Sequence, residues 1–284
     1  MEIKNAKTAS EFLNRSGSAE DCDLNLYNCA LAFSALFNES FDLERYISHI
    51  QDMRQHVEDI YQKCRNRGDL DTVTLRHECI VRVMYDKYEY RGDERNYDDV
   101  KNADMMHVVD RRAGLPVALG IIFMQLGREM GWDIVGLSFP GHFILRMTHD
   151  GVQILIDPFR EGRILQAGDL REILKALMGT SAELSHDYYE EADDHDVLIR
   201  LQNNLKTRLI EAEKYEEALR VVEGTRIFVP DEYRLLFDAA LLKVKTGQIR
   251  GAQEDIVDYI KRAPSIREQQ EAEQLLYEIQ RQMN

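Results

Sequence analysis

The segment between Arg111 and Gly162 constrains the fold more than any other part of the chain. Pro116 suits the first position of an α-helix. The backbone N–H at that position has no hydrogen-bond partner within the helix, so its absence in proline costs nothing. The apolar residues that follow predict a largely buried helix, and Gly131 is typical of a helix end. Asp150-Gly151 then separates two segments of alternating hydrophobicity, which predicts a β-hairpin.

The hairpin places one histidine and one aspartate on the same face of a sheet. With Asp150 and Gly151 in the turn, Asp157 lies opposite Ile144, and His142 is its diagonal neighbour, roughly 7–8 Å away at Cα. A register shifted by two residues would make His142 and Asp157 directly opposed. In either register a carboxylate lies where it can hold an imidazole in one tautomer, as in a catalytic triad. One face is predicted to carry Phe143, Leu145, Met147, Ile154 and Ile156, and the other His142, Ile144, Arg146, Gln153, Leu155 and Asp157.

Four short motifs in and near this segment are specific in combination. They are Asn96-Tyr97-Asp98, Arg112-Ala113-Gly114-Leu115-Pro116, Phe139-Pro140-Gly141-His142-Phe143, and Ile156-Asp157-Pro158-Phe159 followed by Gly162. Together they resemble the SirB-type branch of the transglutaminase-like superfamily, bacterial proteins that carry tetratricopeptide repeats after the core. The resemblance covers roughly residues 43–174 and continues into the C-terminal helices.

The resemblance implies an α+β fold: a papain/transglutaminase-like core with N-terminal helices, followed by a short all-α tetratricopeptide-like repeat domain. In catalytic relatives a Gly-x-Cys begins the helix, and Gly114-Leu115-Pro116 stands in that place here. His142 and Asp157 match the other two positions of the triad. The resemblance also implies that Pro116 in place of the cysteine is usual for this branch, so we expect a non-catalytic core.

Several alternatives remain open at this site. Covalent acyl transfer needs an activated serine, threonine or cysteine beside the base. The four cysteines all precede the Pro116 helix and fit buried structural thiols; they are Cys22, Cys29, Cys64 and Cys79. A hydrolase that uses water at His142 and Asp157, a cysteine enzyme with a distant thiol, and a purely structural His–Asp pair are the competing interpretations. A further one is a small-ligand pocket formed by Arg112, His142, Arg146 and Asp157.

The region before these motifs is predicted to be helical. Apolar residues recur every three or four positions in residues 43–61, and residues 25–37 and 73–85 behave similarly. Residues 91–99 break the pattern with Gly, Asn and Asp, which predicts a loop, and a short helix is expected at 105–109. We therefore assign residues 1–182 to a transglutaminase-like domain with an N-terminal helical region.

Residues 183–196 (ELSHDYYEEADDHD) are acidic and carry few apolar side chains, which predicts an exposed connector. His186 and His195 lie among its carboxylates. Because no fixed ligand spacing accompanies them, we predict solvated side chains and no metal site.

Residues 197–284 contain an internal repeat of 34 positions. The positions that carry its signature are Leu205 and Ala239, Ala218 and Ala252, and Pro230 and Pro264. A period of this length, with alanine late in the repeat and proline at its end, is typical of tetratricopeptide repeats. Residues 267–283 then predict a capping helix. Such repeats either bind a peptide or helix in their groove or brace the core, and two of them are expected to pack against the first domain rather than fold alone.

Composition narrows the range of partners. A net charge of −15 and a pI near 5.0 argue against nonspecific binding to nucleic acid or anionic membranes. No apolar run approaches the ~18 residues of a membrane span, and MEIKNAKTASEF lacks the apolar core of a signal peptide. Scattered cysteines favour a reducing compartment. The sequence thus predicts a cytoplasmic, regulatory protein that binds protein partners through its repeats. No cofactor is expected.

Overall fold

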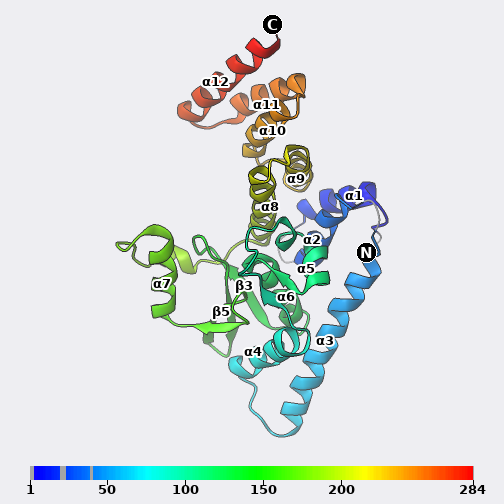
Figure 1. Cartoon of the computed structure of the whole chain (residues 1–284). Coiled ribbons are helices and arrows are strands. Elements are labelled where there is room, and N and C mark those ends of the chain that lie inside the picture. Colours follow the sequence, from blue (N-terminus) through cyan, green and yellow to red (C-terminus); the bar gives the residue numbers. More distant parts are fainter. Residues whose placement is uncertain (1–2, 20–23, 39–40, 284) are drawn as a thin grey trace. The chain divides into compact units, whose positions relative to one another are not determined.

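The computed structural model describes residues 3–19, 24–38 and 41–283 (Figure 1). The described residues divide into two compact units. The first, called here the core unit, comprises residues 24–31 and 41–201, and the second, the repeat unit, comprises residues 3–19, 32–38 and 202–283. Two helices, α2 (Leu26–Ala35) and α8 (Asp194–Glu211), contribute residues to both units.

Helices make up most of the core unit. They are α3 (Leu43–Asn66), α4 (Val73–Val81), the π-helical turn η2 (Arg82–Lys87), the 3-10 turn η3 (Val100–Asn102), α5 (Met105–Arg111), α6 (Pro116–Arg128), α7 (Ala167–Met178) and the 3-10 turn η4 (His186–Tyr189). The periodic apolar stripe predicted for residues 43–61 is the buried side of α3, where Tyr46, Ile50 and Met53 are buried. The α+β class is confirmed.

Helix α6 is the central helix of the core unit, and residues 116–127 are all buried. Pro116 occupies its first turn, as the sequence predicted. Two glycines allow the sheet to approach closely. A Cβ at Gly120 would lie 2.5 Å from the Phe143 ring, and one at Gly127 would overlap Ile134. Because these positions carry no side chain, α6 packs directly on the first two strands of the sheet.

The sheet is antiparallel, with strands in the order β3-β4-β5-β6. The strands are β3 (Asp133–Leu137), β4 (Ile144–His149), β5 (Val152–Asp157) and β6 (Arg163–Leu165). Asp150 and Gly151 both have positive φ, 49° and 76°, as a two-residue hairpin turn requires. Leu145 pairs with Ile156, which confirms the first of the two predicted registers.

Both faces of the sheet are covered, although the sequence indicated one apolar face. On the second face Ile144 and Leu165 pack with Leu170 and Leu174 of α7. The alternation of the hairpin predicted a more polar second face. This face is instead partly apolar, because α7 packs against it.

Two segments differ from the expected loops. Arg91–Gly92 forms a short strand, β1, which pairs in parallel with β2 (Ala113–Gly114) inside the motif before α6. A two-residue ladder is too short to produce a periodic sequence signal. The acidic segment is exposed at many positions but is not a free connector: Ser138 N–H donates to Glu190 O, and Ala192 N–H donates to Gly136 O. It therefore follows the edge of β3, and the backbone hydrogen bonds that anchor it are independent of its acidic side chains.

The repeat unit consists of antiparallel helices. They are α1 (Ala6–Gly17), the end of α2, most of α8, α9 (Tyr215–Phe228), α10 (Arg234–Lys245), α11 (Ile249–Arg262) and α12 (Ile266–Met283). A core formed by Leu236, Ala252, Ile256 and Ala272 joins the last three of them. The N-terminal helix α1 packs on α9, where a Cβ at Gly17 would overlap the backbone of Phe228. Segments distant in sequence thus share this unit, whereas the expected boundaries placed residues 1–182 together.

Within the described residues, no helix is both long enough and apolar enough to cross a membrane.

Candidate functional site

The start of α6 is held by the short parallel ladder before it. Gly114 pairs with Gly92. The next residue, Leu115, is the N-cap of α6, and its N–H donates to the carbonyl of Asn102 at 3.0 Å. Pro116 follows as a buried residue without a reactive group. Position 116 is therefore a rigid helix start filled by a pyrrolidine ring.

His142 and Asp157 lie together. Nε2 of His142 is 3.0 Å from Oδ1 of Asp157; 16% of the histidine side chain is exposed and none of the aspartate side chain. Neither Nε2 nor the second oxygen, Oδ2, makes a hydrogen bond of normal geometry within the described residues. The ring is thus at ion-pair distance from the carboxylate but not aligned with it. His142 lies in a bend just before β4, whereas the sequence placed it on the strand.

The turn after β5 fixes the carboxylate of Asp157. Its Oδ1 accepts hydrogen bonds from the backbone N–H of Phe159 at 2.9 Å and of Arg160 at 3.3 Å. The Arg160 guanidinium approaches Oδ2 to 3.9 Å. Hydrogen bonds of this kind stabilise the charged form of a buried carboxylate, which otherwise would be costly to bury. Asp157 is therefore held in place for structural reasons as well as for its contact with His142.

Tyr85 of η2 supports the same turn, a contribution that the sequence did not reveal. Its hydroxyl donates to the carbonyl of Pro158 at 2.8 Å. Burial raises the pKa of Tyr85 well above its usual value, and the negative charges of Asp157 and Glu161 raise it further. Tyr85 is therefore a neutral hydrogen-bond donor, and only its place in an apolar helix could be read from the sequence.

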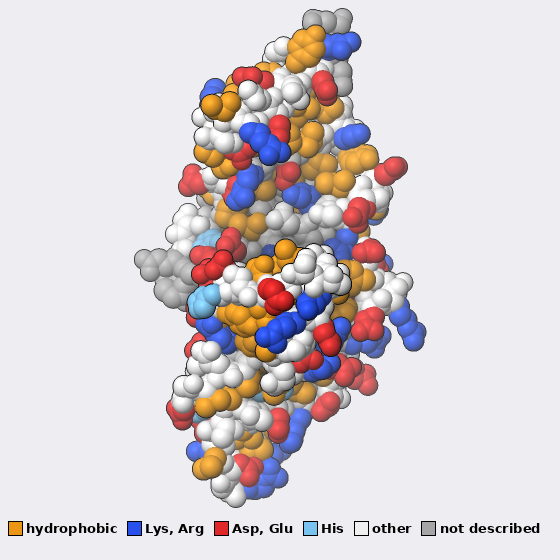
Figure 2. All heavy atoms as spheres, turned by 90° about the vertical axis from the view of Figure 1, so that its left-hand side faces the viewer, with side chains coloured by type: hydrophobic (Ala, Val, Ile, Leu, Met, Phe, Trp, Pro, Cys, Tyr) orange, Lys and Arg blue, Asp and Glu red, His pale blue; other side chains and the backbone are white. Residues whose placement is uncertain are grey.

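Helix α7 covers the loop that carries His142. Gly141 has a φ of +66°, and a Cβ there would lie 2.7 Å from the Leu177 side chain. Leu177 and Met178 at the end of this helix are 52% and 57% exposed. Figure 2, in which the α7 side faces the viewer, shows hydrophobic, basic and acidic side chains intermixed on this face. The positive φ of Gly141 favours glycine in the loop that carries His142.

Arg112 has partners of its own. Its φ is +56°, its Nη1 lies 3.2 Å from Nε2 of His49, and its guanidinium stacks 5.3 Å and 5.2 Å from the ring centres of Tyr88 and Tyr90. The Tyr90 hydroxyl lies 2.9 Å from the same His49 nitrogen. Burial, together with the charge of Arg112, lowers the pKa of His49 to about 4. We call His49, Tyr88, Tyr90 and Arg112 the Arg112 cluster.

Arg146 is also engaged elsewhere. Its Nη1 donates to the carbonyl of Tyr189 at 3.1 Å, and its Nη2 forms an ion pair with Glu191. It therefore anchors the acidic segment to the sheet. The structure brings His142 and Asp157 together but gives Arg112 and Arg146 separate partners, so the four residues do not form one pocket floor.

The described cysteines are all buried. They are Cys29, Cys64 and Cys79, and burial raises the pKa of Cys79 to about 12. A thiol with such a pKa is almost entirely protonated near neutral pH, and the thiolate is the reactive form. Cys22 lies outside the described residues.

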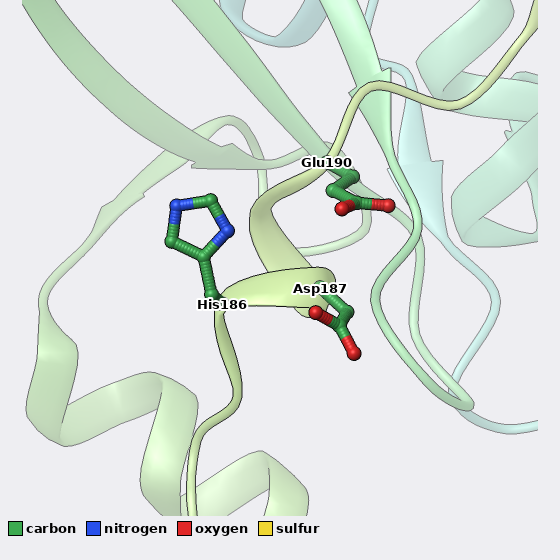
Figure 3. Close-up of side chains that lie close together, drawn as sticks. All are labelled: His186, Asp187 and Glu190. Atoms are coloured by element: carbon green, nitrogen blue, oxygen red, sulfur yellow. The ribbon is translucent and has the colours of Figure 1, made fainter.

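The acidic segment contains a group of possible metal ligands. Ligand atoms of His186, Asp187 and Glu190 lie within 4.8 Å of one another, and all three residues are exposed (Figure 3). They project from the single turn η4 into solvent, and acidic groups at a surface commonly gather in this way without an ion. His195 lies elsewhere, 3.2 Å from the Asp193 carboxylate. The arrangement adds nothing that favours a metal over solvated side chains.

The signature positions of the repeats occupy the places that a helical repeat requires. Leu205, Ala218, Ala239 and Ala252 are buried between helices. Pro230 and Pro264 are exposed and follow the ends of α9 and α11. The alanines permit close helix packing, and the prolines prevent continuation of each second helix.

Comparison with known proteins agrees with this architecture. The transglutaminase-like superfamily matches residues 51–203, and the tetratricopeptide repeat matches residues 205–280. A UPF0162 protein of Xylella fastidiosa is 27% identical over 260 residues, which cover 89% of each chain. A UPF0162 protein of Vibrio cholerae is 31% identical over 215 residues, covering 75% of this chain and 77% of the relative.

The protein SirB1 of Salmonella typhimurium is 30% identical over 158 residues, 55% of this chain and 58% of that protein. No solved structure matches the chain. The first family match spans more than half of the sequence and includes α6, His142 and Asp157. The chain therefore belongs to the transglutaminase-like superfamily and is a relative of the SirB1 and UPF0162 proteins that carries tetratricopeptide repeats after its core.

Proposed function

We propose that this protein is a non-catalytic member of its superfamily, a regulatory protein of the bacterial cytoplasm that binds a protein partner through its repeats. The observation that carries the proposal is Pro116 in the first turn of α6, where catalytic relatives have their nucleophile. A proline has no side-chain donor, acceptor or nucleophile, so the His–Asp pair has no group to activate at this position.

The surroundings of His142 support the same conclusion. In the described part of the chain, Asp157 is the one side chain at ion-pair or hydrogen-bond distance from the imidazole. No thiol or hydroxyl of the described residues makes a hydrogen bond with it. A general base must reach the proton that it removes, through about 2.6–3.2 Å or through one water molecule. A covalent mechanism therefore has a base but no nucleophile within reach.

The repeats offer a surface of suitable chemistry for a protein partner. Lys206 of α8 and Asp238 of α10 form an ion pair at 2.5 Å, so the first helices of successive repeats lie side by side. Leu241 lies three residues after Asp238, on the same side of α10, and is 41% exposed. An exposed apolar side chain flanked by charges is typical of the residues through which repeat surfaces hold a peptide or helix.

A pull-down with the full chain tests this proposal. The wild type and Leu241→Asp are compared as baits in the native cytoplasm, with Leu70→Asp as the matched control. Leu70 is a 79% exposed leucine between α3 and α4 in the core unit. We expect a partner that the wild type and the control retain at equal levels and that Leu241→Asp loses. Retention by all three, with unchanged melting, would contradict binding through this face of the repeats.

One observation favours a second function. The His–Asp pair is retained at 3.0 Å with a buried carboxylate, which suits a histidine that activates water rather than a side chain. A hydrolase of this kind requires turnover that depends on His142 and not on any cysteine. Turnover of the wild type compared with that of His142→Ala separates this hydrolase from the non-catalytic protein.

A further inference from the structure

A pocket lies in the core unit beside the turn that holds Asp157. Its volume is about 700 Å³. The loop after β1 forms one wall, the turn from Phe159 to Glu161 forms another, and Ala113 lies between them, three residues before Pro116. A Cβ at Gly92 would lie 2.5 Å from the Phe159 carbonyl oxygen, so the two walls meet closely at one end. The pocket is therefore built by the same segments that position α6 and Asp157.

Four arginines line this pocket, and one of them is engaged with neighbouring side chains. Arg111 donates to Asp93 at 2.8 Å and to Asn102 at 3.2 Å. That network closes the base of the pocket, because Asn102 in turn donates to the Asn96 carbonyl at 2.7 Å. Arg111 therefore has a structural role, and Asp93 is the carboxylate that neutralises it.

The other three arginines are less engaged than Arg111. They are Arg91, Arg95 and Arg160, all exposed residues that line the pocket. Within the described residues, the guanidinium groups of Arg91 and Arg95 make no hydrogen bond or ion pair. The guanidinium of Arg160 has one long ion pair, in which its Nε lies 3.9 Å from Oδ2 of Asp157. Two further carboxylates in the lining, those of Glu94 and Glu161, form no ion pair with them. The chain has 51 acidic and 36 basic residues, so a pocket lined by two unpaired arginines and a third in one long ion pair is unusual for its composition.

We propose that this pocket binds a small polyanion, a molecule with two or more phosphate or carboxylate groups, through Arg91, Arg95 and Arg160. The planar guanidinium donates two parallel hydrogen bonds to either group. The volume lies within the range of about 300–1,000 Å³ that is usual for small-molecule sites. Phe159, stacked edge-on against Tyr97 at 5.7 Å, provides an apolar wall for the rest of the ligand.

The site goes beyond the proposed function, because its ligand is a small molecule and its residues belong to the core rather than to the repeats. It also touches the remnant triad. Arg160 contributes its side chain to the pocket and its backbone N–H to Asp157. A ligand that orders the Arg160 side chain therefore acts on the turn that holds Asp157 beside His142.

Isothermal titration of the full-length protein with pyrophosphate and with citrate, at constant ionic strength, tests the proposal. We expect saturable binding of at least one of the two probes. Binding of pyrophosphate alone identifies a phosphate-bearing ligand, and binding of citrate alone a carboxylate-bearing one. The double variant Arg95→Ala/Arg160→Ala should weaken binding by about tenfold or more, since each lost charge-assisted contact contributes on this scale. Glu94→Gln/Glu161→Gln should tighten it, because it removes negative charge from the lining.

Arg171→Ala is the matched control, since Arg171 is an exposed arginine of α7 that is outside this pocket. It should leave the affinity unchanged. All the substituted side chains are exposed, and thermal melting confirms that each variant is folded. Absence of saturable binding by both probes would overturn the proposal. Equal weakening by Arg171→Ala and by the double variant would also overturn it, because the interaction would then be a general surface effect.

Discussion

Nε2 of His142 lies 3.0 Å from Oδ1 of Asp157, and the same oxygen accepts the backbone N–H groups of Phe159 and Arg160. One carboxylate oxygen therefore serves both the imidazole and the turn. A carboxylate with two backbone donors is retained for stability even where no reaction depends on it. The place of Asp157 in the fold is therefore explained by its hydrogen bonds to the turn, without any reaction at His142.

Substitution of Asp157 should test its structural role. Asp157→Ala removes the acceptor of two backbone hydrogen bonds in a fully buried place, and we expect it to lower the free energy of unfolding by about 2–4 kcal/mol. Asp157→Asn retains an acceptor oxygen and should lose less. Denaturant unfolding measures both. Asp133→Ala, at an exposed aspartate in β3, is the control; a loss for Asp157→Ala no larger than for this control would show that the turn does not depend on the carboxylate.

Pro116→Cys should create a reactive thiol. The new side chain would lie at a helix N-terminus, which lowers a thiol pKa, and a nearby imidazole would lower it further. We expect faster alkylation by iodoacetamide at position 116 than at Cys79, which is buried and has a pKa of about 12. Peptide mass spectrometry locates the modified residue. Adding His142→Ala should slow the reaction; equal rates with and without His142 would mean that the imidazole does not reach the helix start.

The Arg112 cluster predicts a loss of stability in mild acid. The pKa of His49 is about 4 in the folded protein and near 6.5 in an unfolded chain. Between these values the unfolded chain binds a proton that the folded protein does not, so the free energy of unfolding falls as the pH decreases from about 6.5 to about 4. Because the ring is partly solvated, we expect a contribution of about 1–2 kcal/mol.

Melting of wild type and His49→Gln across this range isolates the effect. Glutamine offers an acceptor to the Tyr90 hydroxyl but does not titrate. Carboxylates that titrate in the same window affect both proteins, so the difference between the two curves is the relevant quantity. A difference that does not change with pH would contradict a neutral His49 in the folded state.

Gly17 predicts a link between the N-terminus and the repeats. Its Cα faces the backbone of Phe228 in α9, and Phe33 packs edge-on against the Phe228 ring at 5.6 Å. We expect Gly17→Ala to destabilise the repeat unit by about 1–3 kcal/mol, because a backbone neighbour cannot move aside as a side chain can. Hydrogen exchange of α9 and α10 reports the effect locally. Gly168→Ala is the control, since a Cβ at that position would meet no atom within 4 Å; equal exchange in the two variants would argue against this contact.

The hairpin could be predicted from the sequence because its signals are local. Asp150-Gly151 predicts the turn, and alternation in the flanking strands predicts which residues share a face. With Asp150 and Gly151 as the two turn residues Leu145 pairs with Ile156, but alternation alone left a register two positions away open. The repeats were also accessible, since a period of 34 residues is a property of the sequence itself. The start of α6 could also be predicted, because proline is favoured at the first position of a helix.

Contacts between distant segments were not accessible in the same way. The sequence placed Arg112 in the motif before α6 and in a candidate ligand pocket, but it could not reveal the partner His49, which lies 63 positions earlier. The cover that α7 provides for Ile144 depends on tertiary packing, and the alternation of a strand cannot reveal it. The membership of α1 in the repeat unit likewise has no local signal, since its apolar stripe does not specify which helix it packs on.

Turnover of ester and amide substrates by the full-length protein and by His142→Ala tests most directly whether the core is non-catalytic. Substrates with a chromogenic or fluorogenic leaving group, in the presence and absence of a primary amine, cover both hydrolysis and acyl transfer. If the core is non-catalytic, we expect the leaving group to be released in the presence of wild type or variant at the same rate as in buffer alone. The two proteins should have equal melting temperatures. Turnover by the wild type that His142→Ala abolishes, while the variant remains folded, would contradict a non-catalytic core and identify the protein as an enzyme.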